Sequence, residues 1–124
     1  MKKSTIISLS VMFILILSGV ICYHLPFEIR YRSAINFGNE LIVNVENYRK
    51  ENNSIPETND YKILETLGFE SEMSFLPQYH KINTTDYMLL YCWGFDPPWL
   101  YYYSKTKEWD YGFDYPKPEK YLEK

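Results

Sequence analysis

Cysteine, histidine and glycine are scarce in this chain, and each scarcity argues against a kind of site. The 124 residues include two cysteines, two histidines and five glycines. Two cysteines exclude a disulfide-rich scaffold. No zinc-binding spacing and no glycine-rich phosphate loop is present. We therefore expect no metal site and no cofactor, and we interpret Asp96, Asp110 and Asp114 as solvated acids of turns or strand ends.

Positive charge is also lacking. The net charge is −3, so we expect no nucleic-acid partner, because such partners require a basic surface. Lys2 and Lys3 are the only charged residues among the first 24, and the rest has 11 basic and 16 acidic residues, a net charge of −5. Aromatic residues make up 19% of the chain, which excludes a disordered protein, and the length suits one small domain.

The N-terminal segment is apolar enough to cross a membrane. Residues 4–27 contain no Asp, Glu, Lys or Arg, and thirteen of the eighteen residues from Thr5 to Cys22 are apolar. About 20 helical residues span a hydrocarbon core of roughly 30 Å. The sequence therefore predicts a cytoplasmic tip and transmembrane anchor over residues 1–25, which contacts the lipid bilayer through residues 5–25.

The two lysines at the start favour a cytoplasmic N-terminus and a C-terminal domain outside the cytoplasm, in the cell envelope. Arg30 and Arg32 follow the apolar run and weaken this preference. The alternatives are a cleaved signal peptide and a buried helix of a soluble protein. Val20-Ile21-Cys22 fits a signal-peptidase site poorly, because that enzyme prefers small residues at the third and first positions before the cut. Ile21 likewise disfavours lipidation of Cys22, so an uncleaved anchor is the favoured interpretation.

An amphipathic helix is predicted from Phe27 to about Lys50, because Pro26 interrupts a continuous helix out of the membrane. Its apolar residues recur at gaps of three and four and form one stripe: Tyr31, Ala34, Ile35, Gly38, Leu41, Ile42, Val45 and Tyr48. Glycine costs about 1 kcal/mol of helix propensity. We therefore expect the helix to approach a sheet closely at Gly38.

A short helix and four strands are predicted next. Thr58, Asn59 or Asp60 can cap the helix, and Gly68 is suited to end it. A loop over residues 69–78 precedes strands at Tyr79 to Asn83, Tyr87 to Phe95, Trp99 to Ser104 and Glu108 to Phe113. This order predicts an α+β fold, with an N-terminal transmembrane helix and then a long amphipathic helix packed on a small antiparallel β-meander. We expect the ectodomain over residues 26–115 and a charged mobile tail over residues 116–124.

The second predicted strand has two apolar faces. One face contains Tyr87, Leu89, Tyr91, Trp93 and Phe95, and the other contains Met88, Leu90, Cys92 and Gly94. We expect the helical stripe to pack on the second, more aliphatic face. The predicted core contact joins Leu41, Ile42 and Val45 to Leu90 and Cys92.

The features between residues 30 and 113 follow a familiar order. An amphipathic helix ends in Tyr48, and Ile55-Pro56 and Leu67-Gly68 precede the tyrosine-rich strands. This order resembles the type IV pilin family, especially the major pseudopilin of type II secretion systems. The resemblance implies a pilin-like fold and packing of an anchored subunit into a filament or envelope complex. The family's Gly-Phe-Thr-like cleavage site is absent, and His24 stands where the family has a glutamate.

Aromatic residues are concentrated in the predicted sheet. Residues 79–115 hold thirteen of the 23 aromatic residues. Because one long helix can cover only one sheet face, we expect an exposed binding patch drawn from Tyr91, Trp93, Trp99, Tyr101 and Tyr103. Tyrosine and tryptophan are favoured at interfaces, since each combines a large apolar area with a polar tip. The alternatives are a filled core and a small-ligand platform such as a sugar site.

No catalytic residue is predicted, and we expect a protein that is not an enzyme. His80 could face Cys92 across neighbouring strands, and a Cys–His pair can form a thiolate nucleophile. Cys92 alternates with Met88 and Leu90, however, so we interpret it as a buried core residue. The favoured function is a single-pass membrane-anchored envelope protein whose ectodomain associates with a protein partner. One alternative is a carbohydrate or small-ligand binding module using Trp93, Trp99 and Trp109. Another is a membrane-anchored immunity or inhibitor protein with a basic target.

Overall fold

The computed structural model describes residues 2–70, 75–93, 96–114 and 116. Two compact units divide the chain: Met1–Arg32 contains the apolar helix, and Ser33–Lys124 contains the sheet. The fold class is α+β, as predicted. The division into an anchor, an ectodomain and a tail stays a prediction. Of the predicted tail, residues 117–124 lie outside the described residues.

A proline separates the two helices of the first unit. Helix α1 (Lys3–His24) has no buried residue, and the chain leaves the helical conformation at Leu25 and Pro26. The Arg30 guanidinium donates hydrogen bonds to the carbonyl oxygens of Tyr23 (2.6 Å) and Leu25 (3.1 Å). It thereby satisfies two acceptors that the end of α1 would otherwise leave without a partner.

The predicted helix from Phe27 to Lys50 is divided in two, so that prediction is wrong in detail. Helix α2 (Phe27–Arg30) ends at Tyr31, whose φ of −108° and ψ of 22° lie outside the helical range. Helix α3 (Arg32–Asn52) continues two residues beyond the predicted end. It stops where Asn53 adopts a left-handed φ of 54°, a conformation that asparagine tolerates at helix ends.

Helix α4 (Tyr61–Thr66) has the boundaries that its sequence signals predict. The Asp60 carboxylate caps it by accepting a hydrogen bond from the Ile63 amide (3.3 Å). At the other end, Gly68 has a φ of 97°. Its amide donates to the carbonyl of Glu65, and the next amide, that of Phe69, donates to the carbonyl of Leu64. This pair of bonds is a Schellman motif, which confirms Gly68 as the stop.

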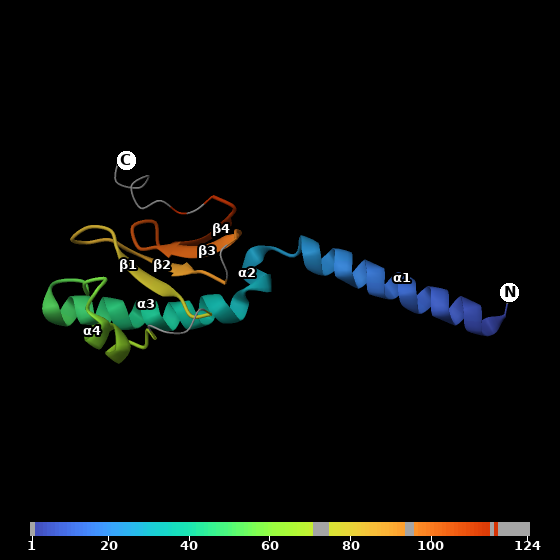
Figure 1. Cartoon of the computed structure of the whole chain (residues 1–124), viewed down its shortest axis with the longest axis horizontal. Helices are drawn as coiled ribbons and strands as arrows, with labels where there is room; N and C mark the ends of the chain where they lie inside the picture. Colours follow the sequence, from blue (N-terminus) through green and yellow to red (C-terminus); the bar gives the residue numbers. More distant parts are fainter. Residues whose placement is uncertain (1, 71–74, 94–95, 115, 117–124) are drawn as a thin grey trace. The chain divides into compact units, whose positions relative to one another are not determined.

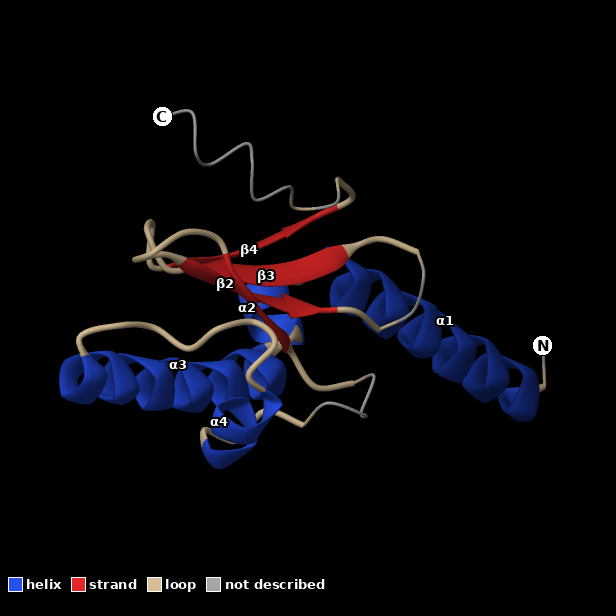
Figure 2. Cartoon of the chain, turned by 60° about the vertical axis from the view of Figure 1, so that its left-hand side comes forward, coloured by secondary structure: helices blue, strands red, loops and turns tan. Residues whose placement is uncertain are grey.

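The four strands form one antiparallel meander in the order β1-β2-β3-β4. Their bounds are Gln78–Lys81, Tyr87–Tyr91, Trp99–Tyr103 and Glu108–Gly112. The second strand ends four residues before the predicted Phe95, and Gly94 and Phe95 lie outside the described residues. Helices α3 and α4 lie on one side of the sheet (Figures 1 and 2).

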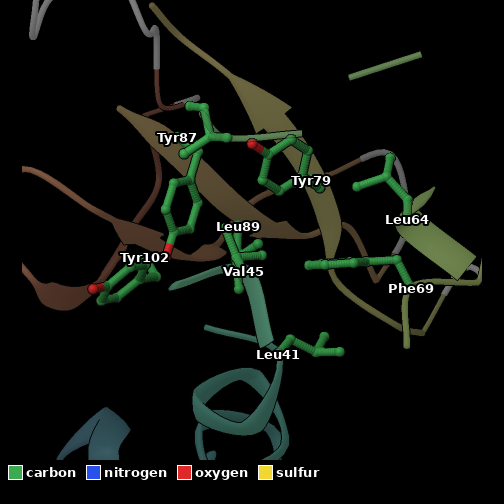
Figure 3. Close-up of a cluster of buried hydrophobic side chains, with 9 residues drawn as sticks. Leu41, Val45, Leu64, Phe69, Tyr79, Tyr87, Leu89 and Tyr102 are labelled. Carbon is green, nitrogen blue, oxygen red and sulfur yellow. The ribbon is translucent and has the colours of Figure 1, made fainter. Parts of the chain in front are cut away.

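The core between α3 and the sheet uses the tyrosine face. Leu41 and Val45 of α3 are 2% and 0% exposed, and they cluster with Tyr87, Leu89 and Tyr102 (Figure 3). Residues from α4 and its flanking segments complete the cluster, among them Ile55, Leu64 and Phe69. Burial of these apolar surfaces stabilises the unit by about 25 cal/mol per Å².

The predicted contact with Leu90 and Cys92 is therefore wrong. Leu90 belongs to a second cluster with Met88 and Trp99 on the opposite face, and Cys92 packs against that cluster. The tyrosines face α3 because their hydroxyls find partners there. Tyr87 donates to the Glu46 carboxylate (3.0 Å), and Tyr91 donates to the carbonyl of Ala34 (2.7 Å).

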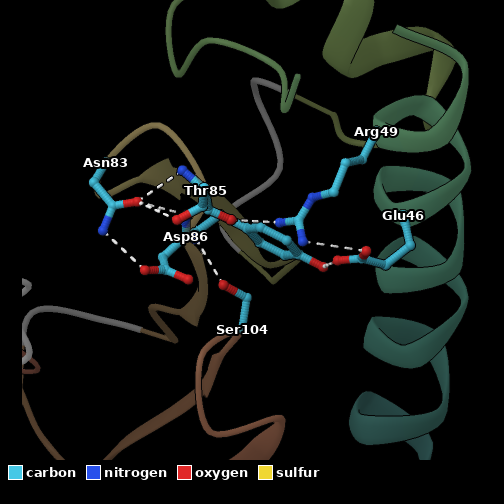
Figure 4. A network of polar contacts seen from close by, with 7 residues as sticks. Glu46, Arg49, Asn83, Thr85, Asp86 and Ser104 are labelled. Carbon is cyan, nitrogen blue, oxygen red and sulfur yellow. Dashed lines mark hydrogen bonds and ion pairs between the residues drawn. The ribbon is translucent and has the colours of Figure 1, made fainter. Parts of the chain in front are cut away.

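A polar network continues from the Tyr87–Glu46 contact to the β1–β2 turn and to Ser104, which follows β3; all of these residues lie near the first residue of β2 (Figure 4). Arg49 forms an ion pair with Glu46 (3.4 Å) and donates to the carbonyl of Thr85 (2.5 Å). The Ser104 hydroxyl accepts a hydrogen bond from the Tyr87 amide (2.8 Å). The Arg49–Thr85 bond joins α3 to the β1–β2 turn. The Ser104 hydroxyl gives the buried Tyr87 amide a partner, and a buried amide without one would be costly.

The close approach predicted at Gly38 is confirmed. Gly38 is buried, and a Cβ atom placed on it would overlap the Trp109 indole. The indole is fixed from two directions, because its Nε1 donates to Asn39 Oδ1 (2.8 Å) and its ring lies 5.5 Å from that of Tyr102. Glycine is thus required here for space.

Candidate functional site

The five predicted binding residues do not form one patch. Tyr91 is 2% exposed on the face that α3 covers. Trp99, Tyr101 and Tyr103 alternate onto the other face, where Trp99 and Tyr103 are 8% and 3% exposed and Tyr101 is half-buried. Trp93 lies beyond the end of β2 and is 42% exposed. A binding role for these residues stays a prediction, and Trp93 is the one of the five whose side chain is exposed.

Trp93 and Phe75 both have exposed side chains, and one hydrogen bond joins the two residues. The Trp93 indole Nε1 donates to the carbonyl oxygen of Phe75 (3.3 Å), and the Phe75 side chain is 60% exposed. The Trp93 ring lies 4.9 Å from that of Tyr91, which is itself fixed to α3. The Trp93 indole therefore packs on a tyrosine that is itself held by α3, and part of its apolar surface stays exposed. We call Phe75 and Trp93 together the Phe75–Trp93 pair.

The three tryptophans do not make a shared sugar platform. Trp99 is buried on one face of the sheet, and Trp109 packs on the other face beside Gly38. Of the three side chains, Trp93 alone is exposed, and Trp109 is half-buried. Stacking of one sugar against several indoles is therefore not available in this arrangement.

A cavity of about 240 Å³ lies between α4 and β1, and the sequence alone did not indicate it. Its lining residues include three aromatic residues, two acidic residues and one histidine: Tyr61, Phe69, Tyr79, Glu65, Glu70 and His80. The lining residues come from two separate stretches of the chain, 58–70 and 77–80, so no short motif marks them. We call this site the α4–β1 cavity.

His80 and Cys92 are not a catalytic pair. The strand register places Met88 opposite His80, and Cys92 lies four residues farther along, about 13 Å away at strand spacing. The expectation that they could face each other across neighbouring strands is therefore wrong. Burial raises the pKa of the Cys92 thiol, which disfavours the reactive thiolate. Burial lowers the pKa of His80, and its Nε2 is shielded from solvent without a hydrogen-bond partner among the described residues.

The acidic residues of the meander have structural roles or are exposed. Asp110 accepts hydrogen bonds from the Tyr101 hydroxyl (3.0 Å) and the Tyr111 amide (2.7 Å). Asp96 and Asp114 are exposed. Within the part of the chain that the structure describes, no group of three or more His, Cys, Asp or Glu side chains could hold a metal ion.

Helix α1 is long and apolar enough to cross a membrane, and it is the one such helix among the described residues. None of its 22 residues is buried. Comparison with known proteins finds no matching family model and no significant similarity to a curated protein or a solved structure. Function is therefore inferred from the chain's own residues.

Proposed function

We propose that this chain is a single-pass membrane protein whose α+β unit lies outside the cytoplasm and associates with a protein partner. The observation that supports the anchor is α1: a 22-residue apolar helix with every residue exposed to its surroundings. Leaving such a helix in water would be costly, at about 25 cal/mol per Å² of apolar surface. A bilayer removes that cost, and the two lysines before α1 favour a cytoplasmic N-terminus.

The α+β unit acts by contact and not by catalysis in this proposal. The Phe75–Trp93 pair is the best candidate for the contact surface, because both side chains are exposed and the tryptophan rests on a fixed tyrosine. Tryptophan is enriched among residues that dominate binding energy at protein interfaces. A partner that covers the indole would bury its apolar area and keep its polar edge hydrogen-bonded.

The resemblance to pilins adds a finer form of this proposal, in which the partner is another anchored subunit. A long helix against an antiparallel meander supports it, whereas the helix break at Leu25 and Pro26 separates α1 from α3. Gentle detergent extraction followed by size measurement distinguishes the two forms. Large homogeneous assemblies of this chain alone support the pilin-like form, and a complex with a different protein supports the general one.

A photocrosslinking experiment tests the association directly. A photoreactive phenylalanine analogue replaces Phe75 in the full membrane-anchored chain, and a matched copy carries it at Phe113, which is 74% exposed. We expect a discrete crosslinked protein from position 75 and a weaker one or none from position 113. Trp93→Ala should reduce that product several-fold and change thermal stability little, because Trp93 belongs to neither buried cluster. Equal crosslinking from both positions, or an effect of Trp93→Ala through unfolding, would contradict the proposed surface.

Retention of the anchor has its own test. We expect N-terminal sequencing of the membrane fraction to find α1 still attached. A mature chain that starts at or near Tyr23 would instead identify the segment as a cleaved signal peptide.

A further inference from the structure

The size of the α4–β1 cavity limits what it can hold. Its volume of about 240 Å³ is below the roughly 300–1,000 Å³ of typical small-molecule sites. The space therefore suits one long side chain better than a whole cofactor or a sugar chain.

The charge of the cavity points to a cation. Glu65 and Glu70 both border it, and neither forms an ion pair within the described residues. The nearby carboxylate of Glu57 differs, because it is paired with Lys81. Beyond α1 the chain carries a net charge of −5, so the surrounding field also attracts positive charge.

The aromatic walls favour the same class of ligand. Phe69 and Tyr79 meet edge to face with ring centroids 5.6 Å apart, and the Tyr79 hydroxyl is held by the carbonyl of Pro56 (2.9 Å). Tyr61 adds a third ring and is 58% exposed, so it borders the opening. Aromatic faces attract ammonium and guanidinium groups and pack against their alkyl stems. His80 does not repel a cation at neutral pH, because burial lowers its pKa and keeps it uncharged.

We infer that the α4–β1 cavity receives a basic side chain, lysine or arginine, presented by the protein partner. Its alkyl stem lies against Phe69 and Tyr79, and its charged head meets Glu65 and Glu70 at the rim. This inference rests on the proposed function and names the chemistry of the partner. It also defines a second contact, separate from the Phe75–Trp93 pair.

A lysine probe tests the site on the full chain in zwitterionic detergent micelles. Nα-acetyl-lysine methylamide is titrated, and the backbone amide resonances of Leu64, Gln78 and His80 are followed by NMR. The matched control probe is Nα-acetyl-norleucine methylamide, which keeps the alkyl stem and lacks the ammonium. We expect saturable, localised shifts with the lysine probe and no saturation with norleucine. Equal binding of both probes, or no binding of the lysine probe, would overturn the inference.

Matched charge variants separate the site from the general field. Glu65→Gln/Glu70→Gln should weaken lysine binding about tenfold, as two partly exposed ion pairs allow. Glu40→Gln/Glu108→Gln removes the same charge from exposed positions that do not line the cavity and should change binding less than twofold. Equal weakening by both pairs would show long-range attraction without a site. Retained amide dispersion confirms folding of each variant, and Tyr61→Ala tests the aromatic wall if the glutamine pair does not fold.

Crosslinking distinguishes failure of this inference from failure of the proposed function. If position 75 still captures its partner in the Glu65→Gln/Glu70→Gln chain with undiminished yield, the cavity inference is wrong and the association stands. If position 75 captures no partner in the unmodified chain, the proposed function fails, whatever the lysine probe does.

Discussion

Replacing Gly38 with alanine tests the packing of α3 on the sheet. On an isolated helix this change would be favourable by up to about 1 kcal/mol, because glycine is a poor helix former. In this protein the added Cβ would overlap the Trp109 ring. Overpacking of a well-packed site costs typically about 1–3 kcal/mol. We expect the steric cost to exceed the gain, with a net loss of about 1–2 kcal/mol in the free energy of unfolding.

The Trp109 indole cannot move away from the added Cβ without losing contacts that stabilise it. It is held by its hydrogen bond to Asn39 (2.8 Å) and by the Tyr102 ring at 5.5 Å. Shortening the side chain should therefore reverse the sign of the effect. In a Trp109→Leu background, Gly38→Ala should stabilise the chain by up to about 1 kcal/mol, since only helix propensity then remains.

Urea unfolding of the full chain in micelles, followed by far-UV circular dichroism, measures all four members of this cycle. Asn47→Ala, at an exposed position of α3, is the control for helix propensity alone. Stabilisation by Gly38→Ala in the unmodified background would refute the close approach. The same follows if the effect of Gly38→Ala is equal in both backgrounds.

Leu41→Ala should lower the free energy of unfolding by about 2–5 kcal/mol, because the Leu41 side chain is 2% exposed in the core. Urea unfolding measures this change, and a loss below about 0.5 kcal/mol would contradict the packing of α3 on the sheet. In the same assay, Asp60→Ala should lower the free energy of unfolding by about 1 kcal/mol, because the α4 cap is lost, and Asp60→Asn should retain most of the stabilisation from the cap. Burial raises the pKa of Tyr91 from 10.0 to about 12. The buried neutral hydroxyl therefore stabilises the fold fully below pH 10, and this stabilisation is lost as the pH rises from 10 toward 12. Tyr91→Phe should abolish the decrease in the free energy of unfolding over that pH range. Burial lowers the pKa of His80 from 6.5, so stability should fall as the pH drops below 6.5, and His80→Gln should flatten that dependence.

Local signals in the sequence predicted the elements well. Asp60 and Gly68 marked the ends of α4, because a capping carboxylate and a left-handed glycine act within a few residues of their own position. Gly38 marked the close approach, because a glycine on an apolar stripe is unfavourable unless space requires it. The break at Tyr31 had no such signal in the sequence.

The choice of sheet face could not be predicted from alternation alone. Both faces of β2 are apolar, and all five residues of this strand are buried. What decides the face is the partner of each tyrosine hydroxyl: Glu46 for Tyr87 and the carbonyl of Ala34 for Tyr91. These partners lie 41 and 57 residues away along the chain, beyond any local pattern. The α4–β1 cavity was missed for the same reason, since the two stretches that line it, 58–70 and 77–80, come together only in the folded chain.

The most direct test of the central claim is the topology of the anchored chain. In a background with Cys22→Ser and Cys92→Ala, a single cysteine is introduced as Thr84→Cys, in the exposed β1–β2 turn, or as Ser4→Cys, which precedes residues 5–25 and keeps both lysines. A membrane-impermeant maleimide is then applied to right-side-out and inside-out membrane vesicles. The proposal predicts labelling of the Thr84→Cys chain in right-side-out vesicles and of the Ser4→Cys chain in inside-out vesicles. The reverse pattern, labelling of both chains from one side, or a chain absent from the membrane would contradict it.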